Sequence, residues 1–274
     1  MLELKEKHED LLQEEKEETT EKSPIKNEPE EDNRFNLAEI LGKTESGLKK
    51  EFYDYQIKEF MAKVGAFNIE INDFPAVEEL LSLVKLGVKE YSLTPFFYAS
   101  AKAVHRKLLG GLTFNAVIDF PKGESSHLAR LQDVKFAVRN GADRVFLTLP
   151  STTLYIKNAS KIKTQLAKIS RICKNRLGLI ITCDKDDEKL KKTLKSLDSV
   201  KADRIILFGE NGGGVDKSSV TLAKETVGGK KIYAFLDGEN TDRVAEFIAL
   251  KIDGVYLKNP KNIGKSLQEK FTIN

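Results

Sequence analysis

Short apolar runs recur along most of the chain, and polar stretches with helical patterning separate them. Eight of these runs are predicted strands, at residues 67–71, 89–93, 113–119, 144–149, 177–182, 204–208, 231–236 and 254–258. Between them, apolar residues at helical spacing predict helices at 76–87, 128–141, 187–197 and 242–252. The strands begin about 22–33 residues apart, so the pattern predicts eight strand–helix units in succession.

Eight such units predict a (β/α)8 TIM barrel, which usually needs about 250 residues. The chain has 274 residues, which leaves room for the barrel and an extra segment before it. A doubly wound open sheet is the alternative, because the strand pattern does not itself reveal closure.

Residues at the predicted helix ends fit this register. Thr94, Asp184 and Asn240 stand where helix N-caps are expected, and their side chains accept bonds from free backbone N–H groups. Gly87 follows the last apolar turn of its helix, as a C-cap glycine does.

The first 33 residues differ sharply in charge from the remainder. They hold 13 Asp and Glu and 5 Lys, a net charge of −8, whereas residues 34–274 carry a net charge of +11. Few of them are apolar, so this segment is predicted to be a disordered acidic tail. It is expected either to solubilise the chain or to act as a partner-binding arm or lid. Residues 34–66 are predicted to be an N-terminal helical segment, and residues 67–274 the barrel.

Composition excludes several classes of protein. No apolar run of about 18 residues predicts a membrane span, and the acidic, polar N-terminus is unlike a signal peptide. Cys173 and Cys183 are the only cysteines, which predicts a reducing, cytoplasmic location. The three histidines have no metal-ligand spacing, so no metal and no cofactor is expected.

Three stretches together carry a resemblance to a known family: "EYSLTPFFYASAKAVHRKLL" (90–109), "NAVIDFPKGESS" (115–126) and "VKFAVRNGADRVFLTLP" (134–150). They resemble the deoxyribose-phosphate aldolase family. Residues 201–209 and 232–255 resemble the same family more weakly. The resemblance covers roughly residues 67–265. It implies a class I aldolase barrel that cleaves deoxyribose 5-phosphate without a metal.

The resemblance also implies which positions carry the chemistry. The Schiff-base lysine of strand 6 is matched by Ile206, the proton-transferring aspartate of strand 4 by Phe146, and the second lysine, on strand 7, by Ala234. A Schiff base needs an amine nucleophile, which none of these side chains supplies. The chain is therefore predicted to be an aldolase-like pseudoenzyme with a binding or scaffold role.

Polar residues at the predicted strand ends are the other candidates for a site. Cys183 and Asp184 lie at one such end, and Lys258 is a candidate relocated Schiff-base lysine, which would make the chain a divergent carbon–carbon lyase acting on a phosphorylated sugar. Alternatively, Asp119, Glu210 and Asp237 bind a divalent cation, or Asp237 bonds its own turn and Lys258 is a solvated end residue. The predicted ligand-binding residues are Asp119, Glu210, Asp237, Gly238 and Lys258.

Two further segments have a functional and a simpler interpretation. The glycine-rich residues 210–217 form either a loop that cradles a phosphate or a plain strand-to-helix connection. Residues 160–176 have an apolar stripe and six Lys and Arg without an acid. This basic helix either binds RNA or an acidic partner, or is a solvated outer helix of the barrel.

Overall fold

The computed structural model describes residues 45–69, 73–105, 111–184 and 186–272. The chain divides into two units, Met1–Lys50 and Glu51–Asn274. The described part of the first unit is the beginning of helix α3 (Glu45–Met61), which falls within the predicted N-terminal helical segment. The predicted acidic tail of residues 1–33 lies outside the described residues.

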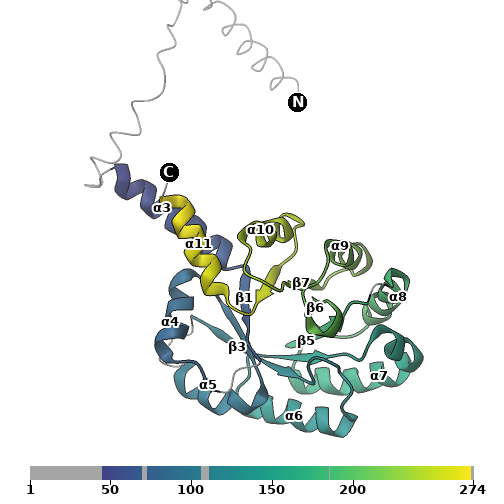
Figure 1. Cartoon of the computed structure of the whole chain (residues 1–274). Coiled ribbons are helices and arrows are strands. Elements are labelled where there is room, and N and C mark those ends of the chain that lie inside the picture. Colours follow the sequence, from purple (N-terminus) through teal and green to yellow (C-terminus); the bar gives the residue numbers. More distant parts are fainter. Residues whose placement is uncertain (1–44, 70–72, 106–110, 185, 273–274) are drawn as a thin grey trace, which may run out of the picture. The chain divides into compact units, whose positions relative to one another are not determined.

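Eight parallel strands close into one barrel (Figure 1), so the predicted TIM barrel is confirmed and the open sheet is excluded. Each strand pairs with the next along the chain, and β1 pairs with β8 to close the barrel. The strands are β1 (Val64–Phe67), β2 (Glu90–Leu93), β3 (Thr113–Ile118), β4 (Arg144–Thr148), β5 (Leu177–Thr182), β6 (Arg204–Phe208), β7 (Lys231–Phe235) and β8 (Gly254–Leu257).

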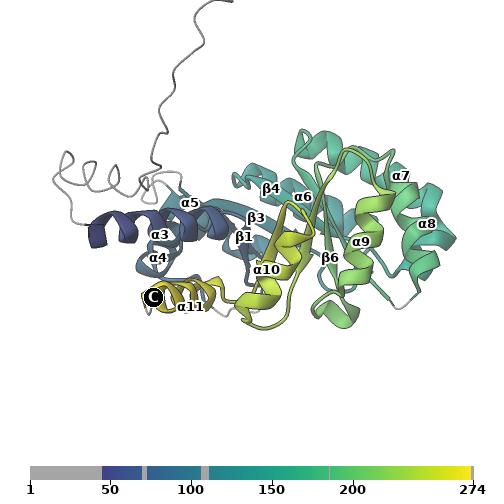
Figure 2. The ribbon, with the colours of Figure 1, turned by 90° about the horizontal axis from the view of Figure 1, so that it is seen from above.

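Helices follow the strands and surround the barrel, and Figure 2 shows α8, α9 and α10 following one another along one side. Within the described ranges, no helix is long and apolar enough to cross a bilayer. The helices after α3 are α4 (Val77–Leu86), α5 (Tyr98–His105), α6 (His127–Arg139), α7 (Thr152–Cys173), α8 (Asp187–Leu197), α9 (Lys217–Thr226), α10 (Thr241–Ala249) and α11 (Pro260–Thr272), with short 3-10 turns η2 (Pro95–Phe97) and η3 (Glu210–Gly212).

The first strand lies earlier in the chain than predicted. The alternating run at residues 67–71, of which residues 70–71 lie outside the described residues, is predicted to form it, but β1 is the apolar run Val64–Phe67. All four residues of β1 are buried. A strand of a parallel barrel is covered on both faces, so a continuous apolar run fits this position better than an alternating one.

The apolar residues fall into two cores, on the two faces of the sheet. The larger core lies between the strands and the surrounding helices. The smaller one fills the barrel interior, because alternate residues of each strand point inward. Its fully buried members are Phe67, Val117, Phe146, Ile180, Ile206, Phe208, Phe235 and Tyr256.

Two of the four predicted helix ends, at Asn240 and Gly87, are confirmed in full. The side chain of Asn240 accepts bonds from the backbone N–H groups of the first turn of α10, and Gly87 ends α4 with a φ of 98°. The predicted cap at Asp184 is wrong: Asp186 caps α8 and accepts a bond from the backbone N–H of Lys189. Asp184 instead accepts a bond from the Thr152 hydroxyl at 2.5 Å. Thr94 stands at the N-cap position of η2 without a side-chain cap bond.

Candidate functional site

The carboxyl ends of the strands form the mouth of the barrel, where TIM-barrel enzymes place their active sites. Here four phenylalanine rings meet, Phe67 from β1, Phe208 from β6, Phe235 from β7, and Phe120 from the loop after β3. The rings of Phe208 and Phe235 stack with centroids 4.4 Å apart, and Phe120 lies against Phe208 at 4.9 Å. Phe67 contacts the other three at 4.8–5.6 Å. We call these four residues the aromatic plug.

The plug leaves almost no empty space at the mouth. The hollow that remains has a volume of ≈ 20 Å³. Pockets that bind small molecules usually measure about 300–1,000 Å³, and a space of this size holds about one water molecule. Its lining residues are Phe67, Asn68, Ile69, Phe120, Gly212, Phe235 and Lys258.

The glycine-rich loop after β6 is held tightly against this plug. A Cβ atom on Gly212 would lie 2.8 Å from the ring of Phe120, and one on Gly214 would lie 2.6 Å from the backbone nitrogen of Asp237. The backbone of Gly209 and Gly213 closes a turn with an N–H to O=C bond of 2.8 Å. Close packing therefore accounts for glycine at these positions.

Ile206 and Phe146 lie inside the barrel and are fully buried. Both side chains therefore lie in the barrel interior, where the resemblance implies catalytic residues, and both are apolar. Ala234 differs: it belongs to the core between the sheet and the helices. Its neighbours Tyr233 and Phe235 occupy the inner face, because successive strand residues alternate between the two faces. The match proposed for Ala234 is thus one residue out of register with the barrel interior.

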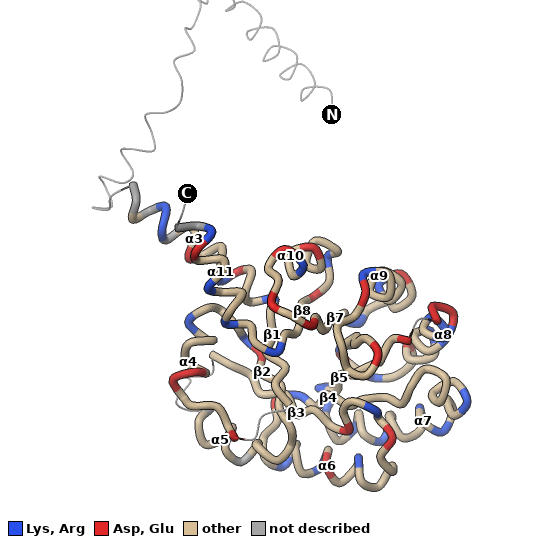
Figure 3. Tube along the Cα trace, in the orientation of Figure 1, with Lys and Arg blue, Asp and Glu red and all other residues tan. Residues whose placement is uncertain are grey.

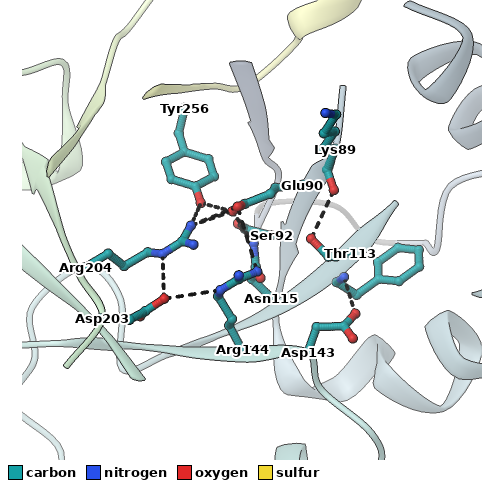
Figure 4. A network of polar contacts seen from close by, with 11 residues as sticks. Lys89, Glu90, Ser92, Thr113, Asn115, Asp143, Arg144, Asp203, Arg204 and Tyr256 are labelled. Carbon is teal, nitrogen blue, oxygen red and sulfur yellow. Dashed lines mark hydrogen bonds and ion pairs between the residues drawn. The ribbon is translucent and has the colours of Figure 1, made fainter. Parts of the chain in front are cut away.

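A charged network fills the other end of the barrel interior (Figure 4). The guanidinium of Arg204 donates from Nη1 to both carboxylate oxygens of Glu90 at 2.8 and 2.9 Å, and the Tyr256 hydroxyl also donates to Glu90. Asn115 donates to Glu90 at 3.1 Å. The ring of Tyr233 stands 4.5 Å from the Arg204 guanidinium carbon.

Glu90 and Arg204 stay ionised in the barrel interior because each neutralises the charge of the other. Burial alone would raise the pKa of Glu90, but the positive charge of Arg204 and the Tyr256 hydrogen bond outweigh it and lower that pKa. Burial alone would lower the pKa of Arg204, yet the neighbouring oxygens of Tyr256 and Glu90 raise it. Glu90 and Arg204 begin their strands, at the end of the barrel opposite the mouth, where TIM barrels place stabilising residues.

Asp119 is engaged in closing the loop between β3 and α6. Its carboxylate accepts bonds from the backbone N–H and the hydroxyl of Ser125, the latter at 2.7 Å. It also pairs with Arg130 of α6 at 2.6 Å, and both side chains are less than a tenth exposed. Arg130 in turn donates to the carbonyl of Gly123. These bonds position Phe120, the residue after Asp119, over the mouth.

The remaining predicted ligand-binding residues lie at the rim of the mouth. The side chains of Glu210, Asp237 and Lys258 are exposed, and Gly238 is an exposed turn residue with a φ of 92°. Of these, Lys258 lines the small hollow beside the plug. Asp119, Glu210 and Asp237 do not form the predicted cation site, since no group of three His, Cys, Asp or Glu able to hold a metal occurs among the described residues.

Cys183 lies at the end of β5 but packs into the core between sheet and helices. Burial raises the pKa of its thiol to about 12. Because the thiolate is the nucleophilic form of cysteine, this side chain is not an activated nucleophile.

Sequence reasoning missed both the aromatic plug and the charged network. A signal for the network was present: Glu90 is the second residue of the predicted strand 89–93 and Arg204 the first of the predicted strand 204–208, and charged residues are rarely buried unless they are paired. The plug has a weaker signal, since phenylalanine is common in barrel cores and four separate segments supply these rings.

Comparison with known proteins supports the predicted relationship over part of the chain. A deoxyribose-phosphate aldolase of Clostridium botulinum strain Okra is 30% identical over 115 residues, which are 41% of this chain and 54% of that protein. A deoxyribose-phosphate aldolase of Clostridioides difficile strain 630 is 26% identical over 152 residues, or 53% of this chain and 66% of that protein. This chain thus spans about half the length of the first curated relatives it matches. No family profile matches it.

Solved structures agree in fold. An aldolase described as QR15 superposes with a TM-score of 0.65 and 17% identity, covering 78% of this chain and 98% of that protein. A deoxyribose phosphate aldolase from Aeropyrum pernix superposes with a TM-score of 0.65 and 14% identity, covering 83% of this chain and 99% of that one. The resemblance to deoxyribose-phosphate aldolases is therefore confirmed, and this protein is aldolase-like in sequence and in fold.

Proposed function

We propose that this aldolase-like protein does not cleave sugar phosphates through a Schiff base and instead has a binding or scaffold role. The observation that carries the proposal is the aromatic plug. A Schiff-base aldolase needs an amine and a carbonyl substrate in contact at the mouth, and here the remaining hollow measures ≈ 20 Å³. Two of the inward residues beneath the plug, Ile206 and Phe146, are also apolar.

Opening the mouth would cost stability. A substrate would have to displace at least Phe120, and about 1.5–3 kcal/mol, the cost of exposing a fully buried side chain of this size, is the upper limit for this half-buried ring. Phe120 is also held through its neighbour Asp119, whose carboxylate pairs with the buried Arg130. The closed mouth thus supports a role that uses the outside of the barrel.

A cleavage assay tests the proposal. Purified full chain is incubated with deoxyribose 5-phosphate, and release of acetaldehyde is measured beside the Aeropyrum pernix aldolase as a positive control. We expect no release above the protein-free rate. Release that increases in proportion to the concentration of this chain, and that survives repeated purification, would overturn the proposal.

Lys258 supports a second candidate, a divergent carbon–carbon lyase acting on a phosphorylated sugar. Lys258 is one of the residues that line the hollow at the mouth, and its side chain ends in an amine. In that case the Lys258→Arg variant would lose any measured activity, because arginine keeps the positive charge but is not deprotonated in proteins. Activity that Lys258→Arg leaves unchanged would exclude Lys258 as the nucleophile. A cytoplasmic location and a phosphorylated small-molecule ligand at the rim remain predictions.

A further inference from the structure

The outer face of α7 carries a row of positive charges. Ile162, Leu166 and Ile169 bury one side of this helix against the barrel. On the solvent side, after the kink at Asn158, positions separated by 7 and 3 residues bring three exposed cations onto one face. These cations are Lys161, Lys168 and Arg171. No Asp or Glu occurs between Thr152 and Cys173, and Figure 3 shows the basic positions along α7.

A groove lies beside this row, between α7 and the turn that connects α8 to β6. Its volume is ≈ 330 Å³, and the charged residues that line it are all basic: Lys163, Arg171 and Lys201. Ser199 and Asn175 add polar side chains to the same lining. The hydroxyl of Ser170 donates to the carbonyl of Lys201 at 2.5 Å and ties that turn to α7.

The groove differs in charge from other hollows of similar size on the molecule. A hollow of ≈ 320 Å³ between α9 and α10 includes Asp216, Asp242 and Glu246. One of ≈ 390 Å³ on α6 includes Asp133. Both of these hollows also contain cations, so what distinguishes the α7 groove from them is a lining without an acidic residue.

In the part of the chain that the structure describes, none of Lys163, Arg171 and Lys201 forms an ion pair. The two acids nearest to Lys201 along the chain pair with other cations: Asp203 with Arg144 and Arg204, and Asp198 with Lys230 at 3.9 Å. Uncompensated cations around a concave surface attract anions and raise their local concentration.

We propose that this groove binds the phosphate backbone of a nucleic acid. A guanidinium, two ammonium groups and neighbouring polar side chains are the donors that phosphate oxygens accept from in such complexes. The lining has no aromatic ring to stack on a base. Its apolar members are the small residues Ala167 and Val200, whereas protein partners usually need a large apolar or aromatic anchor. Binding should therefore be electrostatic and independent of sequence.

The groove is separate from the mouth of the barrel. Asn175 and Ser199 precede β5 and β6, so they lie at the end of the barrel opposite the plug. The inference therefore stands whether or not the barrel catalyses a reaction.

Fluorescence anisotropy with a labelled 20-nucleotide RNA and a DNA duplex of the same length tests this site over a series of salt concentrations. The full-length triple variant Lys163→Gln, Arg171→Gln, Lys201→Gln removes three groove charges. A matched triple variant Lys85→Gln, Lys89→Gln, Lys265→Gln removes three exposed charges elsewhere. We expect log K for the unaltered chain to fall linearly with log salt, and the groove variant to bind at least tenfold more weakly with a slope reduced by about 2–3, at about 0.7–0.9 per contact. The matched variant should keep most of its affinity.

Several results would overturn the inference: a binding constant that does not depend on salt, an equal loss of affinity in both triple variants, or a 20-residue polyglutamate peptide that binds as tightly as the RNA. Circular dichroism checks that the variants are folded. If the groove triple variant is unfolded, the single variants Lys163→Gln and Lys201→Gln replace it, and each should lower the slope by about 0.7–0.9. Unchanged slopes in both single variants would also overturn the inference.

Discussion

Individual aromatic side chains decide what the barrel mouth can hold. Phe235 is fully buried and stacks on Phe208 with an angle of 12° between the rings. Stacked and edge-on ring pairs add about 0.5–1.5 kcal/mol to the free energy gained from burial. The plug is thus a stabilising part of the core, formed where an enzyme of this fold would have an open pocket.

Truncating a plug residue should therefore destabilise the protein strongly. We expect Phe235→Ala to lower the free energy of unfolding by about 3–5 kcal/mol, because it leaves a cavity in a packed interior. The control Phe136→Ala removes a ring that is 47% exposed on α6, and its effect should be much smaller. Urea unfolding of both variants measures the difference. Equal losses would show that the rings of the mouth are loosely packed.

Glu90 should make the stability of the protein depend on pH. Its pKa is lowered in the folded state from an ordinary value of 4.5. Its stabilising contribution is therefore fully present above pH 4.5 and is lost as the pH falls through the folded-state pKa. Glu90→Gln removes one partner of a buried ion pair, which costs about 3–5 kcal/mol at neutral pH.

The difference in unfolding free energy between the unaltered chain and Glu90→Gln should thus be largest at neutral pH and should shrink below pH 4.5. Unfolding curves collected from neutral to acidic pH measure it, with the exposed Glu225→Gln as a control of equal charge change. A difference that stays constant over this range would contradict the assigned role of the Glu90–Arg204 pair.

At the scale of elements, the β3–α6 loop covers the mouth of the barrel. Asp119 and Arg130 connect the start of the loop to α6, and the loop holds Phe120 over the mouth. The polar residue expected to contact a ligand therefore serves to close the site. A carboxylate at a strand end looks the same in sequence in either role, and its partner at Arg130 is visible only once the loop is folded.

Asp119→Ala should cost about 3–5 kcal/mol of unfolding free energy, because it leaves the buried guanidinium of Arg130 without its counter-charge. The exposed Asp133→Ala on α6 is the matched control and should have little effect. Replacing both partners, as Asp119→Leu with Arg130→Met, should restore much of the loss. Thermal unfolding of the set would contradict this role if Asp119→Ala were as mild as Asp133→Ala.

The sequence predicted the strands best where an apolar run is bounded by polar or turn residues. The bounds of β5 and β6, "LGLIIT" and "RIILF", agree with the prediction. It predicted β1 poorly, because the four residues "VGAF" are short and have no alternation. The plug was beyond sequence reasoning for another reason: its rings come from residues 67, 120, 208 and 235, which only barrel closure brings together.

At the scale of the whole molecule, the barrel interior is filled from end to end. The charged network around Glu90 and Arg204 occupies one end, Phe146, Ile206 and Tyr256 belong to the inner core, and the aromatic plug closes the mouth. Glycines inside the barrel make room for the larger rings: a Cβ on Gly178 would lie 2.7 Å from Phe146. Aldolase-like in fold and sequence, the molecule presents its remaining concave surfaces on the outside.

The central claim is that, with the mouth closed by the aromatic plug, none of the lysines that the structure describes forms a Schiff base with a sugar phosphate. Borohydride trapping tests it most directly: the full chain is incubated with deoxyribose 5-phosphate and sodium borohydride, and its intact mass is measured. A Schiff base forms when a lysine amine adds to the aldehyde and water leaves, and borohydride reduces the C=N bond to a stable secondary amine. The account predicts an unchanged mass under conditions in which the Aeropyrum pernix aldolase is labelled. A stoichiometric adduct, mapped by peptide analysis to one lysine such as Lys258, would contradict it.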